Sequence, residues 1–299
     1  MYTKGLRGPT VKSYQDVFRH FNRLMPEVTH AEQLTPAIVD QFFVRLQQRE
    51  RKIGKGRVAV GIKASTIRTY GSKLHTFFDW LCARGHLVSN PVNKSQLPKP
   101  SYSDKRALEK REIERIIAAI TQYVPDRFQL KRDLAIVHVL LFAGLRKTEL
   151  LSLNVSDVDF VRRILTVRGS TSKSKTTRNV PLTPLTTMHL EDYMRERQAR
   201  RCRCERLWVS TKADTAFTSH GLKHWVYTLR RRSGVSFHVH RFRHTFACML
   251  GRNNVSAVKI QKLMGHTDLR MTQTYMRSLG VEDVRDSLHY MTLDNLADL

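Results

Sequence analysis

Four segments from residue 144 onward carry side chains that can act as acids, bases or nucleophiles. They are GLRKTEL at residues 144–150, SKSK at 172–175 ahead of VPL at 180–182, HRFRHT at 240–245, and LMGH at 263–266 with Tyr275 nine residues later. The segments supply arginine, lysine, histidine and tyrosine. A transesterification at a phosphodiester needs a nucleophile, neutralisation of charge on the phosphate oxygens and a proton for the departing oxygen, and these four residue types can supply all three.

Each residue type has a definite part in such a reaction. A tyrosine hydroxyl can attack phosphorus, but its ordinary pKa of about 10 makes it a weak nucleophile unless neighbouring groups assist it. Arginines are permanently charged forks that neutralise phosphate oxygens, and histidines donate hydrogen bonds and handle protons. A lysine on a hairpin can protonate the departing 5′ oxygen. With these side chains neutralising charge and moving protons, the chemistry needs no metal. It needs no ATP, because a phosphotyrosyl ester keeps the free energy of the broken bond.

Taken singly, these residues also fit ordinary structural explanations. Arg146 could cap a helix or pair with Glu149, and Tyr275 could be a core or surface tyrosine. Lys173 and Lys175 could make nonspecific phosphate contacts. The order and spacing of all the segments together favour the catalytic interpretation.

A metal site is not expected. His240 and His244 would share one face of a helix, with His238 close by, yet no acidic ligand or HExxH pattern accompanies them. The four cysteines of the chain are Cys82, Cys202, Cys204 and Cys248. They are too few and too irregularly spaced for a disulfide framework or a paired zinc motif, so we expect reduced thiols and no cofactor.

In this order, the segments resemble the tyrosine recombinase family, also called the phage integrase family, over about residues 105–280. Arg146 matches the first arginine of the family within the pattern Gly-Leu-Arg-x-x-Glu-Leu, and Glu149 matches the acid of that pattern. His240 and Arg243 match its His-x-x-Arg pair.

The remaining matches complete the set that the resemblance implies. His266 follows the Leu-Gly-His pattern, in which Met264 here replaces leucine, and Tyr275 stands at the place of the nucleophile. Lys173 matches the hairpin lysine because it lies seven residues before the Val-Pro-Leu strand, with Lys175 as the competing residue. The implied catalytic residues are Arg146, Lys173, His240, Arg243, His266 and Tyr275, with Glu149 in support.

The resemblance implies a mostly α-helical fold with a small β-hairpin or sheet. A helical core-binding, SAM-like DNA-binding domain would occupy residues 1–100, and a mixed α/β catalytic domain residues 101–299, with a tail at 276–299. The implied activity is that of a site-specific DNA recombinase of a mobile element, integrase- or transposase-like, acting through a covalent 3′-phosphotyrosyl intermediate. Double-stranded DNA, a homotetramer on paired sites and accessory DNA-bending proteins are the implied partners.

The charge of the chain favours a polyanionic partner. Lysine and arginine number 52 against 26 acidic residues, a net charge of +26 that exceeds what solubility requires. Residues 1–100 hold 17 basic and 6 acidic residues, and residues 101–275 hold 33 and 15, so both parts are basic. The longest nearly apolar run, residues 134–145, is shorter than the roughly twenty residues of a membrane span. With no signal sequence after Met1, we expect a bacterial, cytoplasmic, nucleoid-associated protein.

Periodicity and punctuation predict the elements that must position these residues. In the first hundred residues they predict helices at 11–24, 35–46 and 65–81, the last with Ser65 as N-cap. Residues 49–63 hold six basic residues, one acid and three glycines, which predicts a flexible basic connector. The proline-rich stretch at 90–100 predicts a linker and the domain boundary.

In the second part the pattern predicts helices and one hairpin. The helices are at residues 110–120, 132–142, 185–203, 219–232, 241–250 and 256–264. The hairpin pairs residues 163–168 with 179–182 across a polar loop. The tail at 276–299 has two basic and five acidic residues with leucines between them, which favours docking on protein in its own chain or a neighbouring copy; a frayed terminus fits as well.

Three other functions stay open on the sequence. The same chemistry would serve a cleave-and-reseal enzyme resembling type IB topoisomerases or telomere resolvases, which a two-plasmid recombination assay distinguishes. A DNA-binding repressor on the same fold is disfavoured by the full catalytic set. A metal-dependent transposase or nuclease is disfavoured because no clustered acidic triad is present.

Overall fold

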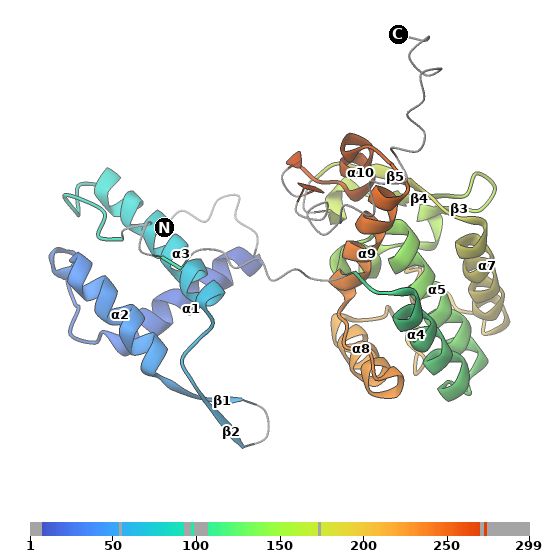
Figure 1. Ribbon diagram of the computed structural model, residues 1–299, viewed down its shortest axis with the longest axis horizontal. Coiled ribbons are helices and arrows are strands. Elements are labelled where there is room, and N and C mark those ends of the chain that lie inside the picture. The colour runs from blue at the N-terminus through green and yellow to red at the C-terminus, as the bar shows by residue number, and fades with distance from the viewer. Residues whose placement is uncertain are drawn as a thin grey trace, which may run out of the picture. The chain divides into compact units, whose positions relative to one another are not determined.

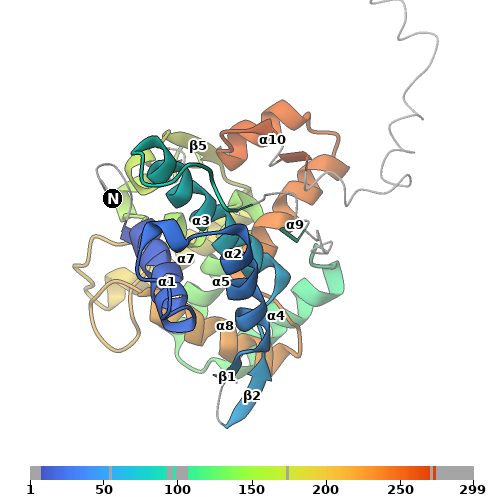
Figure 2. The same cartoon turned by 90° about the vertical axis from the view of Figure 1, so that its left-hand side faces the viewer.

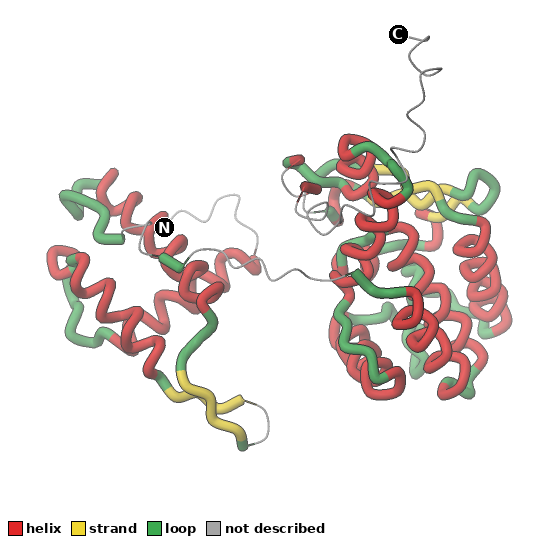
Figure 3. The backbone as a smooth tube through the Cα atoms, viewed as in Figure 1, coloured by secondary structure: helices red, strands yellow, loops and turns green. Residues whose placement is uncertain are grey.

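The computed structural model describes residues 8–53, 56–92, 97–98, 107–172, 175–269 and 272–273. The chain divides into two compact units, Met1–Ser103 and Asp104–Leu299. Both are built mainly from helices, and each holds one small antiparallel sheet in its described part (Figure 1, Figure 3). The predicted mostly helical fold is therefore confirmed. The predicted tail lies outside the described residues, and no described helix is long and apolar enough to cross a bilayer.

The first unit is built on α1 (Gly8–Leu24), α2 (Pro36–Gln48) and α3 (Ala64–Ala83). A short 3-10 helix, Ala31–Gln33, precedes α2. Thr35, at the predicted start of this helix, caps α2, because its hydroxyl oxygen accepts a hydrogen bond from the Ile38 amide at 3.4 Å. Apolar side chains from all three helices form the core of this unit, among them Val17, Phe42, Leu46, Leu74 and Phe78.

The predicted N-cap of α3 is wrong. The helix begins at Ala64 with Lys63 as the N-cap residue, rather than after Ser65. The amides of Thr66 and Ile67 both donate to the Lys63 carbonyl oxygen, at 2.8 and 3.1 Å. Backbone hydrogen bonds, and not a side-chain cap, therefore set the start of this helix.

The predicted flexible connector between α2 and α3 is also wrong. It forms an antiparallel pair of strands, β1 (Glu50–Ile53) and β2 (Arg57–Val60), which project from the helices of this unit (Figure 1, Figure 2). At the base of the pair, the Gly61 amide donates to the Arg49 carbonyl oxygen at 2.9 Å. β-branched valines in the second strand favour the extended backbone, which the glycine and charge content of the segment had obscured.

The second unit has all six predicted helices, with shifted ends. They are α4 (Lys110–Tyr123), α5 (Arg127–Ala143), α7 (Pro184–Ala199), α8 (Ser219–Ser233), α9 (Val239–Arg252) and α10 (Ala257–Met264). Helix α5 lies at the centre and contacts α4, α7 and α9, so it is buried almost all round (Figure 1). It starts before the predicted residue because Asp126 caps it by accepting from the Gln129 amide at 3.1 Å.

The small sheet of the second unit has the strand order β3 (Val158–Asp159), β4 (Ile164–Val167) and β5 (Arg178–Pro181). The predicted hairpin is present as the β4–β5 pair, with Leu165 opposite Val180. One further helix, α6 (Lys147–Ser152), was not predicted. Its six residues are too short for a helical repeat to show in the sequence.

Candidate active site

Arg146 is held at the junction of α5 and α6. Helix α5 ends at Ala143, and Gly144 turns the chain with a φ of +58°, a left-handed conformation that glycine adopts without strain. A Cβ atom on Gly144 would also collide with the Phe246 ring. Arg146 then caps α6, because the Glu149 carboxylate accepts a hydrogen bond from the Arg146 amide at 2.9 Å. A glycine and an acidic capping residue thus create this short helix.

Glu149 is the centre of the site and is completely buried. Its carboxylate accepts hydrogen bonds from Arg146 Nη1 at 2.7 Å, from Arg178 Nη1 and Nη2 at 3.1 and 2.8 Å, and from Ser172 Oγ at 3.2 Å. Burial alone would raise the pKa of Glu149, but the hydrogen bonds and charge of Arg178, together with Arg146, lower it to about 2. The carboxylate is therefore ionised at neutral pH and fixes two guanidinium groups.

Arg243 lies on α9 beneath the surface and is 1% exposed. Its Nη1 donates to the Gly144 carbonyl oxygen at 2.6 Å and lies 3.9 Å from a Glu149 oxygen. Its Nη2 donates to the Met264 carbonyl oxygen at 2.6 Å and lies 2.8 Å from His266 Nε2. Arg243 therefore ties the ends of α5 and α10 to the buried carboxylate.

His266 follows α10 and is held between two partners. Because a guanidinium group can only donate, His266 Nε2 accepts from Arg243, and Nδ1 carries the proton. Nδ1 then donates to Thr272 Oγ1 at 2.9 Å. Burial, followed by the charges of Arg243 and Arg146, lowers the pKa of His266 to about 3. His266 is therefore a neutral hydrogen-bonding group at neutral pH.

The segment at residues 240–245 holds two histidines, which occupy different surroundings. His240 is exposed in the first turn of α9. Its charge contributes to the lowered pKa of His266, so the two rings lie close enough to interact electrostatically. His244 is buried, with Nε2 3.6 Å from Cys248 Sγ. Among the residues that the structure describes, no group of three or more histidine, cysteine or acidic side chains could hold a metal ion.

Arg178 belongs to the cluster and was missed by the sequence reasoning. It lies in β5, where Arg178 and Val180 are buried and Asn179 and Pro181 are exposed. Its Nε donates to the Leu263 carbonyl oxygen at 2.8 Å, in addition to the bonds with Glu149. The sequence did contain a signal for this residue, because Arg178 alternates with the apolar Val180 on the inward face of the predicted strand. A buried charge requires a buried partner, so such an arginine indicates a buried acid.

Two predicted catalytic residues, Lys173 and Tyr275, lie outside the described residues. Ser172, directly before Lys173, is fully buried and donates to Glu149. The competing Lys175 is exposed, with a φ of +57°. The structure thus brings Arg146, Arg243, His240 and His266 to one region, together with the start of the lysine loop.

The cluster has a net positive charge. Three arginines, Arg146, Arg178 and Arg243, face the single carboxylate of Glu149, and His266 is neutral, which leaves a charge of +2. The Arg146 side chain is 18% exposed, so it is the arginine of the three that solvent or a ligand reaches most readily. A group of this kind attracts an anion such as a phosphate.

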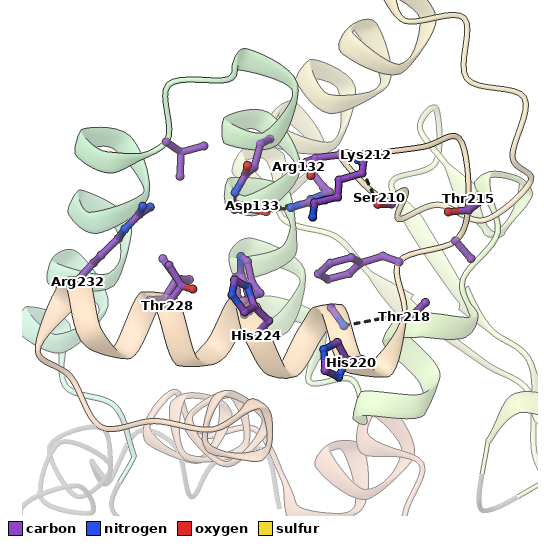
Figure 4. A pocket seen from close by; sticks show the side chains of 18 residues that line it. Arg132, Asp133, Ser210, Lys212, Thr215, Thr218, His220, His224, Thr228 and Arg232 are labelled. Atoms are coloured by element: carbon purple, nitrogen blue, oxygen red, sulfur yellow. Dashed lines mark hydrogen bonds and ion pairs between the residues drawn. The ribbon is translucent and has the colours of Figure 1, made fainter. Parts of the chain in front are cut away.

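A second basic feature of this unit is a cavity of about 530 Å³ between α5, α8 and the loop before α8 (Figure 4). Its lining includes Lys212, His220, His224 and Arg232, and it shares no residue with the Glu149 cluster. The acid that lines it, Asp133, is bound to Arg132 at 2.8 Å. Burial raises the pKa of Asp133, and the charge of Arg132 opposes that rise.

The chain is similar to known tyrosine recombinases over nearly its whole length. The tyrosine recombinase XerA of Saccharolobus solfataricus is 27% identical over 283 residues, which cover 94% of this chain and 86% of the relative. The tyrosine recombinase XerC of Staphylococcus aureus is 28% identical over 271 residues, which cover 89% of this chain and 85% of the relative.

Solved structures show the same fold at lower identity. The Tn1549 transposon integrase in complex with transposon right end DNA has a TM-score of 0.75 at 17% identity, with 96% of this chain and 95% of that chain covered. A lambda integrase dimer bound to a core site has a TM-score of 0.66 at 19% identity, with 93% and 92% covered.

The family assignment rests on a match to most of the second unit. The sequence pattern of the phage integrase family matches residues 106–280, which is more than half of the chain. These residues include the whole cluster around Glu149. The chain belongs to the phage integrase family and is a tyrosine site-specific recombinase, an enzyme that cleaves and rejoins DNA.

Proposed function

We propose that the cluster around Glu149 is the catalytic centre at which Tyr275 attacks a phosphodiester of duplex DNA. The Tyr275 oxygen bonds to phosphorus, the bond from phosphorus to the 5′ oxygen breaks, and a 3′-phosphotyrosyl link forms. A 5′ hydroxyl from another strand then reverses the step, so that strands are exchanged. No ATP is needed, because the bond energy is kept in the covalent link.

The convergence of Arg146, Arg178 and Arg243 on Glu149 carries this proposal. One carboxylate balances one of the three guanidinium charges and leaves a net charge of +2. A phosphodiester has one negative charge, whereas the five-coordinate phosphorus formed by attack of a phenolate has two. Charge held in place beforehand therefore stabilises the transition state more than the ground state.

Chain connectivity supports the placement of the two residues outside the described ranges. Tyr275 follows Thr272 by three residues, and Thr272 is bonded to His266 at 2.9 Å. Three residues span at most about 11 Å, which supports the proposal that Tyr275 acts at this cluster. Lys173 is joined directly to Ser172, which is bonded to Glu149. In the proposal Lys173 gives its proton to the departing 5′ oxygen.

Direct contact between Arg243 and a phosphate requires a change in its surroundings. Both terminal nitrogens of Arg243 donate to carbonyl oxygens, those of Gly144 and Met264, and the side chain is 1% exposed. In the proposal, phosphate oxygens replace one of these carbonyls when DNA binds. Arg146 is already partly exposed and makes the first contact, and His240 donates a hydrogen bond to the same phosphate, while His266 accepts from Arg243 and keeps that guanidinium group in place.

Both units take part in DNA binding in this proposal. Residues 1–100 carry a net charge of +11 and act as a core-binding domain, and residues 101–299 act as the catalytic domain. Solved structures of the same fold are bound to DNA, as the Tn1549 and lambda integrase complexes show for those proteins. Four copies act on two paired sites, with the acidic tail at 276–299 docked on a neighbouring copy and DNA-bending proteins as accessory partners. We further infer a bacterial, cytoplasmic site of action, on the DNA of a mobile element.

A covalent capture experiment tests the catalytic proposal and identifies the DNA site at the same time. The full chain is incubated in EDTA with nicked duplexes that contain a randomised segment, and adducts are precipitated with SDS and potassium. We expect DNA to be captured through its 3′ end and the recovered sequences to define a recognition site. Capture of 5′-linked DNA would contradict the proposal.

The matched control is Tyr275→Phe, which removes one oxygen and keeps the ring. This variant should bind the selected duplex as tightly as the parent and form no adduct. Retention of the adduct would place the nucleophile elsewhere. Deletion of residues 281–299 should weaken the pairing of two sites more than binding to one, and equal losses would contradict a tail docked between copies.

A further inference from the structure

The β1–β2 pair of the first unit, which we call the ribbon (Glu50–Val60), stands apart from the hydrophobic core of that unit. None of its described residues belongs to the core cluster. Val58 and Val60 are 57% and 67% exposed, although β-branched residues in strands are usually packed on one side. An isolated two-stranded ribbon is marginally stable in water, because it has no further strand or helix to pack against. A bound partner would therefore stabilise this one.

The pairing register separates the side chains onto two faces. Glu50 is opposite Val60 and Lys52 is opposite Val58, so these four side chains share one face. Arg51, Ala59 and Arg57 alternate with them and lie on the other face. The first face is exposed throughout, whereas on the second Arg51 and Ala59 are half-buried and Arg51 Nε donates to the Gly61 carbonyl oxygen at 2.7 Å. The first face is therefore the one accessible to a partner, and it presents Lys52 beside two valines.

The charge of the ribbon and its flanks selects the partner. Residues 49–63 contain six basic residues and one acid. Two copies of this chain meeting through the ribbon would bring these cations together, which like charges oppose. A polyanion with apolar patches fits both properties. Duplex DNA offers phosphates along the edges of the major groove and thymine methyl groups on its floor.

We infer that the ribbon enters the major groove of DNA beside the segment held by the helices of the first unit. The groove is about 12 Å wide and admits a two-stranded β-ribbon. Val58 and Val60 contact thymine methyl groups on its floor, and Lys52, on the same face, contacts a phosphate at one edge. Arg57, the first residue of β2, lies on the other face, and its long side chain extends past the strand edge to a phosphate. This inference rests on the proposed DNA binding by the first unit and adds a sequence-reading element to it.

The base of the ribbon permits a clean removal. The Arg49 carbonyl oxygen accepts from the Gly61 amide at 2.9 Å, so the two ends of the ribbon are already adjacent. Replacing residues 50–60 by Asn-Gly, a sequence suited to a tight hairpin turn, leaves α2 and α3 joined without strain. Thermal melting followed by circular dichroism should then match that of the parent, because no core residue is lost.

The experiment measures binding of the full chain carrying Tyr275→Phe to a fluorescent 30-base-pair duplex of random sequence between 50 and 200 mM salt. Using Tyr275→Phe separates this test from the catalytic proposal, because no covalent step contributes. Removal of the ribbon should weaken binding about tenfold or more. Lys52→Gln with Arg57→Gln should lower the steepness of the salt dependence by about two, since each phosphate contact contributes about 0.9.

The matched control removes the same charge elsewhere. Arg162→Gln with Arg163→Gln alters two exposed arginines in a turn of the other unit. This pair should change the salt dependence by less than half as much as the ribbon pair. Equal changes for both pairs would overturn the inference, because net charge alone would then explain the loss.

A second measurement tests entry into the groove. Parent protein should bind a thymine-rich duplex more tightly than the same duplex with uracil, which lacks the methyl group. Val58→Ser with Val60→Ser should reduce that difference by at least half. An unchanged difference, or a ribbon deletion that abolishes self-association in sedimentation without weakening DNA binding, would overturn the proposal in favour of a contact between copies.

Discussion

Glu149 and Arg178 form a two-pronged ion pair that is sealed inside the second unit, with N–O distances of 2.8 and 3.1 Å. Neither side chain is more than 7% exposed. Arg178 also donates to the Leu263 carbonyl oxygen near the end of α10. The pair therefore joins β5, α6 and the segment that carries His266, so the stability of the unit and the geometry of the site depend on the same contact.

Replacing Arg178 by methionine should lower the free energy of unfolding by about 2 to 3 kcal/mol. Loss of one partner from a buried pair typically costs about 3 to 5 kcal/mol, but Arg146 and Arg243 still face the carboxylate here. Adduct formation should fall further than the loss of stability alone explains, because Arg178 no longer binds the Leu263 carbonyl oxygen and so no longer fixes the segment that carries His266. Urea unfolding and covalent capture with a nicked duplex measure the two effects.

The matched control for this change is Arg168→Met, directly after β4. Arg168 pairs with Asp157 at 3.1 Å and donates to the Ser152 carbonyl oxygen at 2.6 Å, but it is 34% exposed, so water can replace it and its loss should cost about 1 kcal/mol. Arg178→Lys should restore part of the stability and little of the adduct rate, since an ammonium group does not reproduce the fork. Equal losses for Arg168→Met and Arg178→Met would contradict a special role of the buried pair.

Gly265 provides a second test of the same contact. Its φ is +62°, and a Cβ atom there would lie 2.9 Å from Arg178 Nη1. Gly265→Ala should therefore push Arg178 away from Glu149 and slow adduct formation. Gly85→Ala separates contact from backbone strain, because Gly85 has a φ of +74° with open space around it. Gly85→Ala should cost about 1 kcal/mol and leave the adduct rate unchanged; a similar rate for both variants would argue against the contact.

Much of the fold could be predicted because its signals are local. Thr35 at the start of α2, Gly144 after α5 and Gly265 after α10 are caps whose effect depends on neighbouring residues alone. Apolar periodicity located each long helix in the same way. The end of α7 was placed too late, because the basic run after Ala199 keeps a helical composition, whereas Arg201 adopts a left-handed φ of +54° that ends the helix.

The features that could not be predicted depend on partners distant in the sequence. Arg178 and Glu149 are separated by 29 residues, and no local pattern shows that they pair. The burial of Arg243 depends on carbonyl groups of two other segments. The ribbon looked like a flexible connector because glycines and cations outweighed its few valines. Composition reports average tendencies, whereas the pairing of Arg49 with Gly61 is a single tertiary contact.

His138 should make the stability of the second unit depend on pH. Burial, with the charge of His189, lowers the pKa of His138 from 6.5 to about 4. The unfolded chain thus binds a proton near pH 6.5 that the folded chain refuses until about pH 4, so the free energy of unfolding falls as pH drops through this range. At pH 5 this residue alone should cost about 2 kcal/mol relative to pH 7.5.

His138→Leu should remove that cost and raise stability even at pH 7.5. The Nδ1 atom of His138 is buried without a hydrogen-bond partner among the described residues, which leucine avoids. Urea midpoints of the two proteins at pH 7.5 and 5 measure the effect. The difference in urea midpoint between parent and variant should grow as the pH falls. A constant difference would show that His138 takes up its proton in the folded state as readily as in the unfolded chain.

The hairpin lysine can be identified through the leaving group. If Lys173 protonates the departing 5′ oxygen, Lys173→Ala should lower the cleavage rate about a hundredfold or more, while Lys175→Ala changes it little. A nicked duplex with sulfur in place of that 5′ oxygen needs no proton from the enzyme, because a thiolate is a good leaving group. Cleavage of the sulfur substrate by Lys173→Ala should therefore approach the parent rate. Rescue of Lys175→Ala instead would assign the role to that residue, and rescue of neither would mean that the lysines act on binding and not on proton transfer.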